Sequence, residues 1–195
     1  MRNSQQNAVT IPVHKPDLQE KLFFLLSGII TSVPLTLFVA SFTDSLCISL
    51  PFFFAQICSV AVFTPFVEEF AKVFPLFYRH GETTRSLFVL GFMVGIGFGF
   101  TEFLLYVFVL DQSVFVRLPA IFFHAAATSI TAYGIGTNRP WLFYLIAVGL
   151  HFAINISALL SSSLWLLIGP VAISATYLLS WYLYKRTTEN LSGRF

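Results

Sequence analysis

The stretch SLFVLGFMVGIGFGFTEFLLYVFVL, residues 86–110, decides the class of structure to expect. It contains a single charged side chain, Glu102. A helix needs about 20 consecutive apolar residues to cross the ~30 Å hydrocarbon core of a bilayer. This run is longer than that, so it predicts a membrane-spanning helix with one carboxylate embedded in it.

The rest of the chain repeats the pattern. Of its 195 residues, 56% are hydrophobic and only 10% are charged, whereas soluble domains carry about 25% charged residues. Apolar stretches run over residues 22–43, 46–78, 86–110, 119–137, 141–160 and 164–184. The sequence thus predicts an all-α, polytopic integral membrane helix bundle of about six transmembrane helices. Residues 46–78 would be ~50 Å long as one helix. We therefore expect Pro51 and Pro65 to kink it, its first part to lie at the interface, or a split that gives seven helices.

The charges outside these stretches set the expected domains and orientation. We expect an N-terminal tail of residues 1–21, a transmembrane domain of residues 22–184 and a C-terminal tail of residues 185–195. When successive loops are assigned to alternate sides, all the basic residues except Arg117 fall on one face. Basic residues mark the cytoplasmic side, so both tails are expected there. The net charge of +2 gives no reason to expect a nucleic-acid partner.

Two other features are interpreted as packing. Cys47 and Cys58 lie in apolar sequence, without the spacing of a metal site, and are read as packing residues. The third apolar stretch carries a stripe of small residues at Gly91, Gly95, Gly97 and Gly99. Small residues let membrane helices approach closely, so this stripe predicts a tight helix–helix contact.

The membrane-embedded ionisable residues lie on the four middle stretches. They are Glu68, Glu69, Lys72, Glu102, His124 and His151. A charged residue in lipid costs roughly 2.5–3.5 kcal/mol on insertion scales, and such residues usually mark a functional site. One glutamate and Lys72 could form an ion pair within their helix, and a lone histidine could be a packing residue. At a rise of ~1.5 Å per residue from the nearest basic boundary, however, all four stretches place their polar residue at mid-depth or in the outer half. One shared site is therefore predicted.

Pairs at i,i+4 share a helix face and indicate the chemistry of that site. These pairs are Phe98 with Glu102, His124 with Thr128, and His151 with Asn155. A buried glutamate can act as general base to a water, and a histidine and an asparagine can donate hydrogen bonds to an oxyanion. Two histidines and one or two glutamates could equally hold a divalent metal with an open position for water. The residues thus predict a hydrolytic site.

Four motifs occur in order along these helices. Glu68 to Lys72 reads EExxK, Phe98 to Glu102 reads FxxxE, His124 precedes glycines at 134 and 136, and His151 to Asn155 reads HxxxN. Over about residues 60 to 160 this order resembles the PrsW family of intramembrane proteases. That family is related to the type II CAAX prenyl proteases and to bacteriocin-processing membrane proteases.

The resemblance implies roles for individual residues. Glu68 matches the residue that activates water in the type II prenyl proteases, with Glu69 and Lys72 as its partner carboxylate and base. His151 and Asn155 match the oxyanion-stabilising pair, and His124 matches the additional PrsW histidine. Glu102 stands where the prenyl proteases have a histidine, so their mechanism cannot be copied directly. The resemblance further implies an endopeptidase that cuts a membrane-anchored protein, such as an anti-sigma factor, on the outer side.

The sequence is compatible with hydrolysis both with and without a bound metal ion. Glu68, Glu102, His124 and His151 are the candidate ligands of a divalent ion such as zinc. No i,i+4 pair of histidines fixes such a site, and Asn155 is a poor zinc ligand. We therefore expect water activation by Glu68 with no obligatory cofactor, supported by Lys72, Phe98 and Thr128.

Two other functions fit the same composition. A proton-coupled transporter or channel also needs membrane carboxylates and histidines, although the chain shows no internal repeat. A non-catalytic membrane protein that binds a partner is the other alternative. The protease interpretation predicts a membrane-anchored protein substrate and the bilayer as partners. It leaves the substrate's identity and the oligomeric state open.

Overall fold

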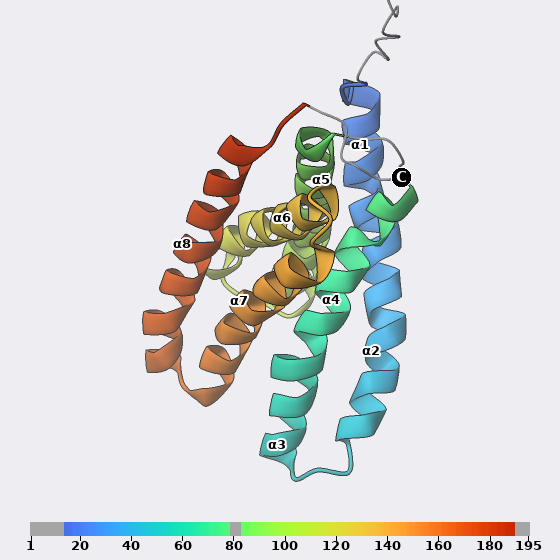
Figure 1. Cartoon of the computed structure of the whole chain (residues 1–195). Coiled ribbons are helices and arrows are strands. Elements are labelled where there is room, and N and C mark those ends of the chain that lie inside the picture. The colour runs from blue at the N-terminus through green and yellow to red at the C-terminus, as the bar shows by residue number, and fades with distance from the viewer. Residues whose placement is uncertain (1–13, 79–82, 190–195) are drawn as a thin grey trace, which may run out of the picture.

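The computed structural model covers the whole chain, and residues 14–78 and 83–189 are described here. Every regular element in these ranges is a helix (Figure 1). We label α-helices α and π or 3-10 turns η. In chain order the elements are α1 Leu18–Ser27, η1 Gly28–Ser32, α2 Val33–Cys47, α3 Phe52–Gln56, η2 Ile57–Phe63, α4 Thr64–Val73, η3 Phe74–Tyr78, α5 Thr84–Leu104, η4 Leu105–Val109, α6 Val114–Gly136, α7 Pro140–Leu160 and α8 Ser162–Arg186. The all-α polytopic bundle is confirmed.

Five helical segments are long and apolar enough to cross a membrane. They are Leu18–Cys47, Thr84–Val109, Val114–Gly136, Pro140–Leu160 and Ser163–Arg186. The remaining predicted stretch, residues 46–78, contains the helical series from α3 to η3, which carries both glutamates and the lysine of the EExxK motif. This series runs without a non-helical residue from Phe52 to Tyr78. It is therefore one helical segment rather than two.

Prolines explain the change of helical winding at η1 and η2. η1 directly precedes Val33 and Pro34, and η2 directly precedes Thr64 and Pro65. A proline lacks an N–H and its ring clashes with the carbonyl four residues earlier. A π turn widens the helix at that point and accommodates the ring. Pro51 does not kink a helix, because it lies in extended conformation just before α3.

α5 and α6 form the centre of the bundle. Half of the most apolar window of each is buried inside the protein, against 22% in the other three spans. The glycine stripe makes this contact possible: a Cβ on Gly95 would lie 2.5 Å from the Cα of Ala125 and from the carbonyl oxygen of His124. On the opposite side, a Cβ on Gly97 would collide with the backbone carbonyl of Leu25 in α1. The predicted close packing at this stripe is therefore present on both faces of α5.

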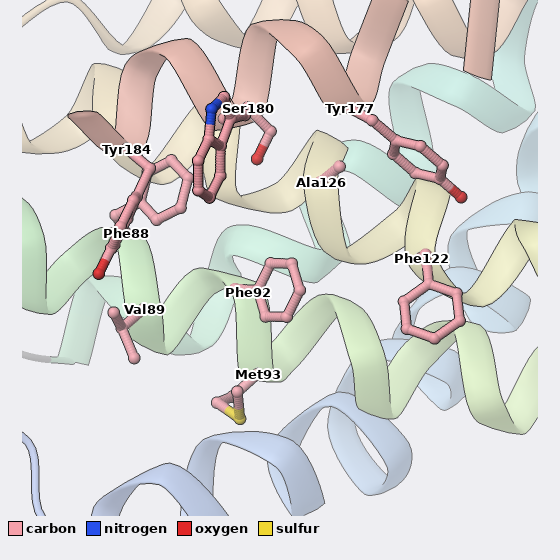
Figure 2. Close-up of a pocket in the computed structure, with 10 residues that line it drawn as sticks. Phe88, Val89, Phe92, Met93, Phe122, Ala126, Tyr177, Ser180 and Tyr184 are labelled. Atoms are coloured by element: carbon pink, nitrogen blue, oxygen red, sulfur yellow. The ribbon is translucent and has the colours of Figure 1, made fainter. Parts of the chain in front are cut away.

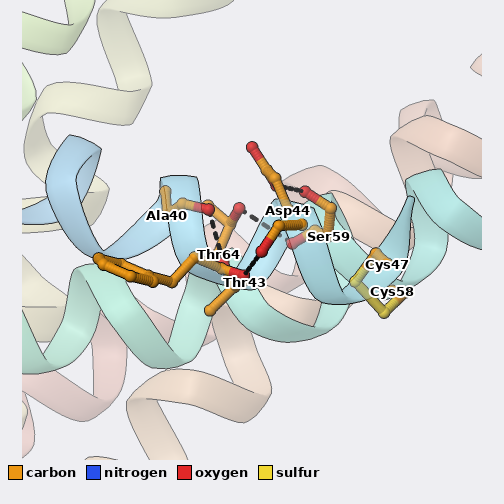
Figure 3. Close-up of a disulfide and its surroundings, with 9 residues drawn as sticks. Ala40, Thr43, Asp44, Cys47, Cys58, Ser59 and Thr64 are labelled. Atoms are coloured by element: carbon orange, nitrogen blue, oxygen red, sulfur yellow. Dashed lines mark hydrogen bonds between the residues drawn. A yellow bond between two sulfur atoms is a disulfide. The ribbon is translucent and has the colours of Figure 1, made fainter. Parts of the chain in front are cut away.

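A disulfide joins Cys47 and Cys58 (Figure 3). Cys47 is the last residue of α2, and Cys58 lies in η2, with the two Cα atoms 5.9 Å apart. The interpretation of these cysteines as unpaired packing residues was wrong. The turn between α2 and α3 folds the chain into a hairpin and brings the two side chains together. A hydrogen bond from the Ser59 hydroxyl to the Asp44 carboxylate ties the same two segments.

Candidate active site

The predicted polar residues converge on one cavity between the helices from η2 to α8. It has a volume of about 590 Å³. Its polar lining includes Glu68, Glu102, Arg117, His124, His151 and Asn155. The four middle spans therefore bring their ionisable side chains to a single place, as the sequence predicted. A cluster around one cavity, rather than a file along a pore, favours a reaction site over a transport path.

α4 turns its charged side inward. Glu68, Glu69 and Lys72 are all buried. The side chains at positions 66, 70 and 74 are phenylalanines that are between 41% and 49% exposed. Residues four apart share a helix face, so the aromatic side of α4 points outward, where a membrane supplies lipid. This inverted amphipathic pattern is what places two carboxylates and an ammonium inside the bundle.

Glu69 and Lys72 form the closed part of the cluster. Both side chains have an exposed fraction of zero, and the Lys72 Nζ lies 2.6 Å from the Glu69 Oε1. The same oxygen lies 2.9 Å from the Nδ1 of His151, and the Lys72 Nζ lies 2.9 Å from the Nδ1 of His124. One ion pair on α4 thereby contacts both imidazoles, on α6 and on α7.

These contacts determine which ring nitrogens carry hydrogen. An ammonium has only donors and an ionised carboxylate only acceptors. His151 therefore donates its Nδ1–H to Glu69, which leaves a lone pair on its Nε2. His124 accepts from Lys72 at Nδ1 and donates its Nε2–H to the Oε2 of Glu102 at 2.5 Å. Glu69 thus acts on His151 as the carboxylate that orients a histidine in many metal and hydrolytic sites.

Glu102 and Arg117 form a second charged pair at the cavity. The Arg117 Nη2 lies 3.9 Å from the Glu102 Oε1, and its guanidinium lies 3.2 Å from the centre of the Tyr106 ring. Arg117 lies in the first turns of α6, on the outer end of that helix in the predicted orientation. The sequence marks Arg117 only as the exception in the charge pattern. Its contacts with Glu102 and Tyr106 make it a further charged residue of the cavity.

Glu68 is the least satisfied residue of the cluster. Its Oε2 is buried and makes no hydrogen bond with any described residue. The Nε2 of His151 lies 3.9 Å from that oxygen. A buried polar atom without a partner is costly and calls for an explanation. Glu68 also lines the polar cavity, in which a water or a substrate can bind.

The cluster also has the composition of a metal site. One oxygen of Glu68 and one ring nitrogen each of His124 and His151 lie within 4.8 Å of one another. Glu68 Oε2 and His151 Nε2 are available as they stand, whereas both nitrogens of His124 are engaged by Lys72 and Glu102. The residues fit a divalent ion in number and type, provided that His124 releases one of its two partners.

Asn155 has a contact that the sequence did not indicate. Its Nδ2 donates to the backbone carbonyl of Val60 at 2.9 Å. In the π turn, Thr64 gives its N–H to Ser59, and the next residue, Pro65, has no N–H. The Val60 carbonyl therefore has neither the α-type nor the π-type partner, and the Asn155 amide supplies the missing donor. This bond ties α7 to the segment that carries Glu68.

The two remaining predicted residues lie beside the cluster. The Phe98 ring lies 5.1 Å from the His124 ring and 5.1 Å from the Lys72 Nζ, so it packs against the network. The Thr128 hydroxyl donates to the His124 carbonyl of its own helix at 2.8 Å. Phe98 thus contacts the site side chains, whereas the Thr128 hydroxyl is committed to the backbone.

The class of protein follows from this combination. A carboxylate held without a partner, beside an imidazole lone pair and a polar cavity inside an apolar bundle, is suited to activate water away from bulk solvent. That is the arrangement of an integral membrane hydrolase.

Comparison with known families makes the assignment specific. The family described as PrsW family intramembrane metalloprotease matches residues 18–183. The chain belongs to this family, and it is an intramembrane protease with a protein substrate in the membrane. Comparisons with curated proteins and with solved structures gave no match.

Proposed function

We propose that Glu68 activates the water that cleaves a peptide bond of a membrane-anchored protein. The observation that carries this proposal is that Glu68 lines the polar cavity while its buried Oε2 has no hydrogen-bond partner among the described residues. A general base must lie within reach of the proton that it removes. Of the three glutamates in the cluster, Glu69 is held by Lys72 and His151 and Glu102 by His124, so Glu68 is the one left to act on a water.

The surrounding residues support this role for Glu68. His151 presents its Nε2 lone pair to the same space and accepts a hydrogen bond from the water, while Glu69 fixes the ring by its Nδ1–H. After Glu68 takes a proton, the hydroxide attacks the carbonyl and an oxyanion develops. Arg117 and the second N–H of Asn155 line the cavity as donors for that oxyanion. His151 changes role from the expected oxyanion donor to the group that orients the water.

Asn155 has a second role in this scheme. Because its first N–H satisfies the Val60 carbonyl, it fixes the helical segment eight residues before Glu68. We propose that it acts mainly as a positioning residue for Glu68. Lys72 has a similar task, since it contacts Glu69 and His124 at once. Phe98 packs against the same network. The Thr128 hydroxyl bonds only to the backbone of its own helix, α6.

A divalent ion, such as zinc, is the second way in which this cluster can serve hydrolysis. Glu68, His124 and His151 would hold it, and the family description as metalloprotease supports this reading. When bound, the ion would supply a polarised water and a Lewis acid for the substrate carbonyl. In that case Glu102 keeps its hydrogen bond to His124 and orients that ligand.

The orientation of the protein in the membrane is part of the proposal. We infer cytoplasmic tails at residues 1–21 and 185–195 around the transmembrane protease domain of residues 22–184, and a site toward the outer half. α1 begins and α8 ends at one end of the bundle, and the turn between α2 and α3 lies at the opposite end (Figure 1). Lys185 and Arg186 lie in the last turn of α8, whereas Cys47 of the disulfide is the last residue of α2. Disulfides form in oxidising compartments outside the cytoplasm, so both features support one orientation. A tail that is labelled from the outer side in intact cells would contradict it.

The direct test is cleavage of a single-span membrane protein, such as an anti-sigma-factor-like substrate, by purified protein in detergent. Glu68→Gln should abolish cleavage, whereas Asp111→Asn, an exposed acid-to-amide control, should retain it. Normal cleavage by Glu68→Gln would reassign the base to Glu69 or Glu102.

Elemental analysis of active protein decides the metal question. Stoichiometric zinc that is lost with activity on chelation, and that is absent from His151→Ala, would establish the metal-assisted route. Full activity after exhaustive chelation, with no metal detected, would establish activation by Glu68 alone.

A further inference from the structure

An apolar groove lies on the far side of α6 from the polar cavity. It has a volume of about 550 Å³ and is bounded by α5, α6 and α8 (Figure 2). Its lining includes Phe92, Met93, Phe122, Tyr177, Trp181 and Tyr184. Ligand sites in proteins usually measure roughly 300–1,000 Å³. The groove is therefore large enough for a ligand, yet it takes no part in the proposed hydrolysis.

Two of the hydroxyl groups along the groove already have partners. The Ser180 hydroxyl lies 2.8 Å from the Ser129 hydroxyl, and the Tyr177 hydroxyl donates to the Pro119 carbonyl at 2.7 Å. The rest of the lining is mostly aromatic and aliphatic, so the groove offers a ligand mainly apolar contact. A hydrocarbon chain meets this requirement without leaving a polar group unsatisfied on either side.

A basic pocket adjoins the groove at the end where α5 begins. It has a volume of about 140 Å³ and is lined by Lys15, Lys21, Thr83, Arg85, Ser86 and Glu189, among others. Val89 lines both spaces, and the Arg85 guanidinium lies 4.9 Å from the centre of the Tyr184 ring in the groove. The two spaces therefore adjoin: one is cationic and the other is apolar.

The charges in the basic pocket do not balance. Glu189 pairs with Lys15 at 2.8 Å. That hydrogen bond and the charge of Lys15 lower the pKa of the exposed Glu189 carboxyl. Lys21 makes no ion pair with any described residue, and the Nε of Arg85 is buried without a hydrogen-bond partner. The Arg85 Nη2 donates to the Thr187 carbonyl at 3.4 Å, which leaves the charge of Arg85 unpaired. Lys21 and Arg85 are thus two cations of the lining that form no ion pair with a described residue.

We propose that this composite site binds a glycerophospholipid with an anionic headgroup. The phosphate lies in the basic pocket between Lys21 and Arg85, and an acyl chain lies in the groove between α5 and α8. Basic pockets between membrane helices bind anionic lipid headgroups in this way. The aromatic rings near the junction support the assignment, because tyrosine and tryptophan favour the membrane interface where headgroups lie. Trp181 and Tyr182 each lie under a basic side chain, at 5.0 Å and 4.6 Å.

We expect the site to select ligands that have both an anionic headgroup and an acyl chain. Full-length protein in a neutral detergent would be titrated with phosphatidylglycerol, with phosphatidylcholine and with inorganic phosphate, and binding would be followed by native mass spectrometry. We expect phosphatidylglycerol to bind with 1:1 stoichiometry and at least ten-fold more tightly than phosphatidylcholine. Inorganic phosphate should neither bind nor compete at millimolar concentration. Equal binding of the two lipids, or competition by phosphate alone, would overturn the proposal.

Two variants distinguish lipid binding in this pocket from a general attraction to the positive charge of the surface. The double variant Lys21→Gln/Arg85→Gln should lose the preference for phosphatidylglycerol. Arg139→Gln removes an exposed positive charge between α6 and α7, outside both the pocket and the groove, and should keep the preference. Equal loss in both variants would show diffuse attraction to the surface and would overturn the proposal. Displacement of bound lipid by a single-span substrate would also overturn it, since the groove would then be a substrate site. The comparison of lipids in the unmodified protein stands even if a variant fails to fold.

Discussion

Glu68 and Glu69 are neighbours on α4, are both buried, and yet lie in two differently organised halves of one cluster. In the closed half, Glu69 is bonded to Lys72 and His151 through one oxygen. In the open half, Glu68 lines the cavity, and the nearest ring nitrogen, Nε2 of His151, lies 3.9 Å from its Oε2. The Oε2 atoms of both glutamates are buried without a hydrogen-bond partner among the described residues, so the difference between them is the pairing of Glu69 through its Oε1. Buried charges are tolerated when they are paired and hydrogen-bonded. Glu69 therefore belongs with the residues that hold the site, and Glu68 is the one left to act in it.

The largest expected effect is on activity, in the open half. Glu68→Gln keeps the shape of the side chain but cannot accept a proton from water. Cleavage should fall by about 10²–10⁴-fold, the usual contribution of a general base. Stability in detergent should be unchanged or higher, because an unsatisfied carboxylate is removed. A variant that unfolds instead would show that Glu68 belongs with the closed half.

The next largest effect is on stability, in the closed half. Lys72→Met leaves the Glu69 carboxylate buried without its cation and should cost about 3–5 kcal/mol in unfolding free energy. The double variant Glu69→Leu/Lys72→Met removes both charges and should recover much of that loss. Denaturant titration of the detergent-solubilised protein measures both values. Additive losses in the double variant would show that the two charges do not act as a pair.

A smaller effect tests the link between the two halves. Asn155→Ala leaves the Val60 carbonyl without a donor, which should cost about 1–3 kcal/mol. Pro65→Ala restores an N–H at position 65 that can serve the same carbonyl. In the Pro65→Ala background, the loss of stability and of activity caused by Asn155→Ala should therefore shrink. An undiminished loss of activity in that background would mean that Asn155 acts on the substrate directly.

The smallest effect on activity and stability is expected for Thr128, which lies beside the cluster. Thr128→Val removes a hydroxyl that bonds only to the carbonyl of His124 on its own helix. Such a bond adds little to a helix that is already hydrogen-bonded, so activity should stay at the level of the unmodified protein. The change in stability should be about 1 kcal/mol or less. A clear loss of activity in the cleavage assay would place Thr128 among the site residues.

The spans and the polar residues of the site could be read from the sequence because both depend on local composition. An apolar run with one carboxylate, such as residues 86–110, has few structural alternatives. The disulfide could not be read in this way, since it depends on how the turn after Cys47 sets the register of α2 against η2. The same holds for the Asn155 contact, which arises only because the π turn and Pro65 together leave one carbonyl without a donor. Arg117 was visible as an anomaly in the charge pattern, but only the structure shows which partners explain it.

The glycine contacts of α5 restrict how a substrate can reach the cluster. α5 is held against α6 through Gly95 and against α1 through Gly97, in both cases at the distance where backbones touch. It therefore cannot tilt toward either neighbour to admit a polypeptide. The spans of α7 and α8 have 22% of their most apolar window buried, against 50% for those of α5 and α6. The N-terminal span has the same 22%, but the Cys47–Cys58 disulfide ties it to η2. The lateral gate of this protease should accordingly lie on the α7–α8 side, with α5 and α6 as the fixed wall against which it opens.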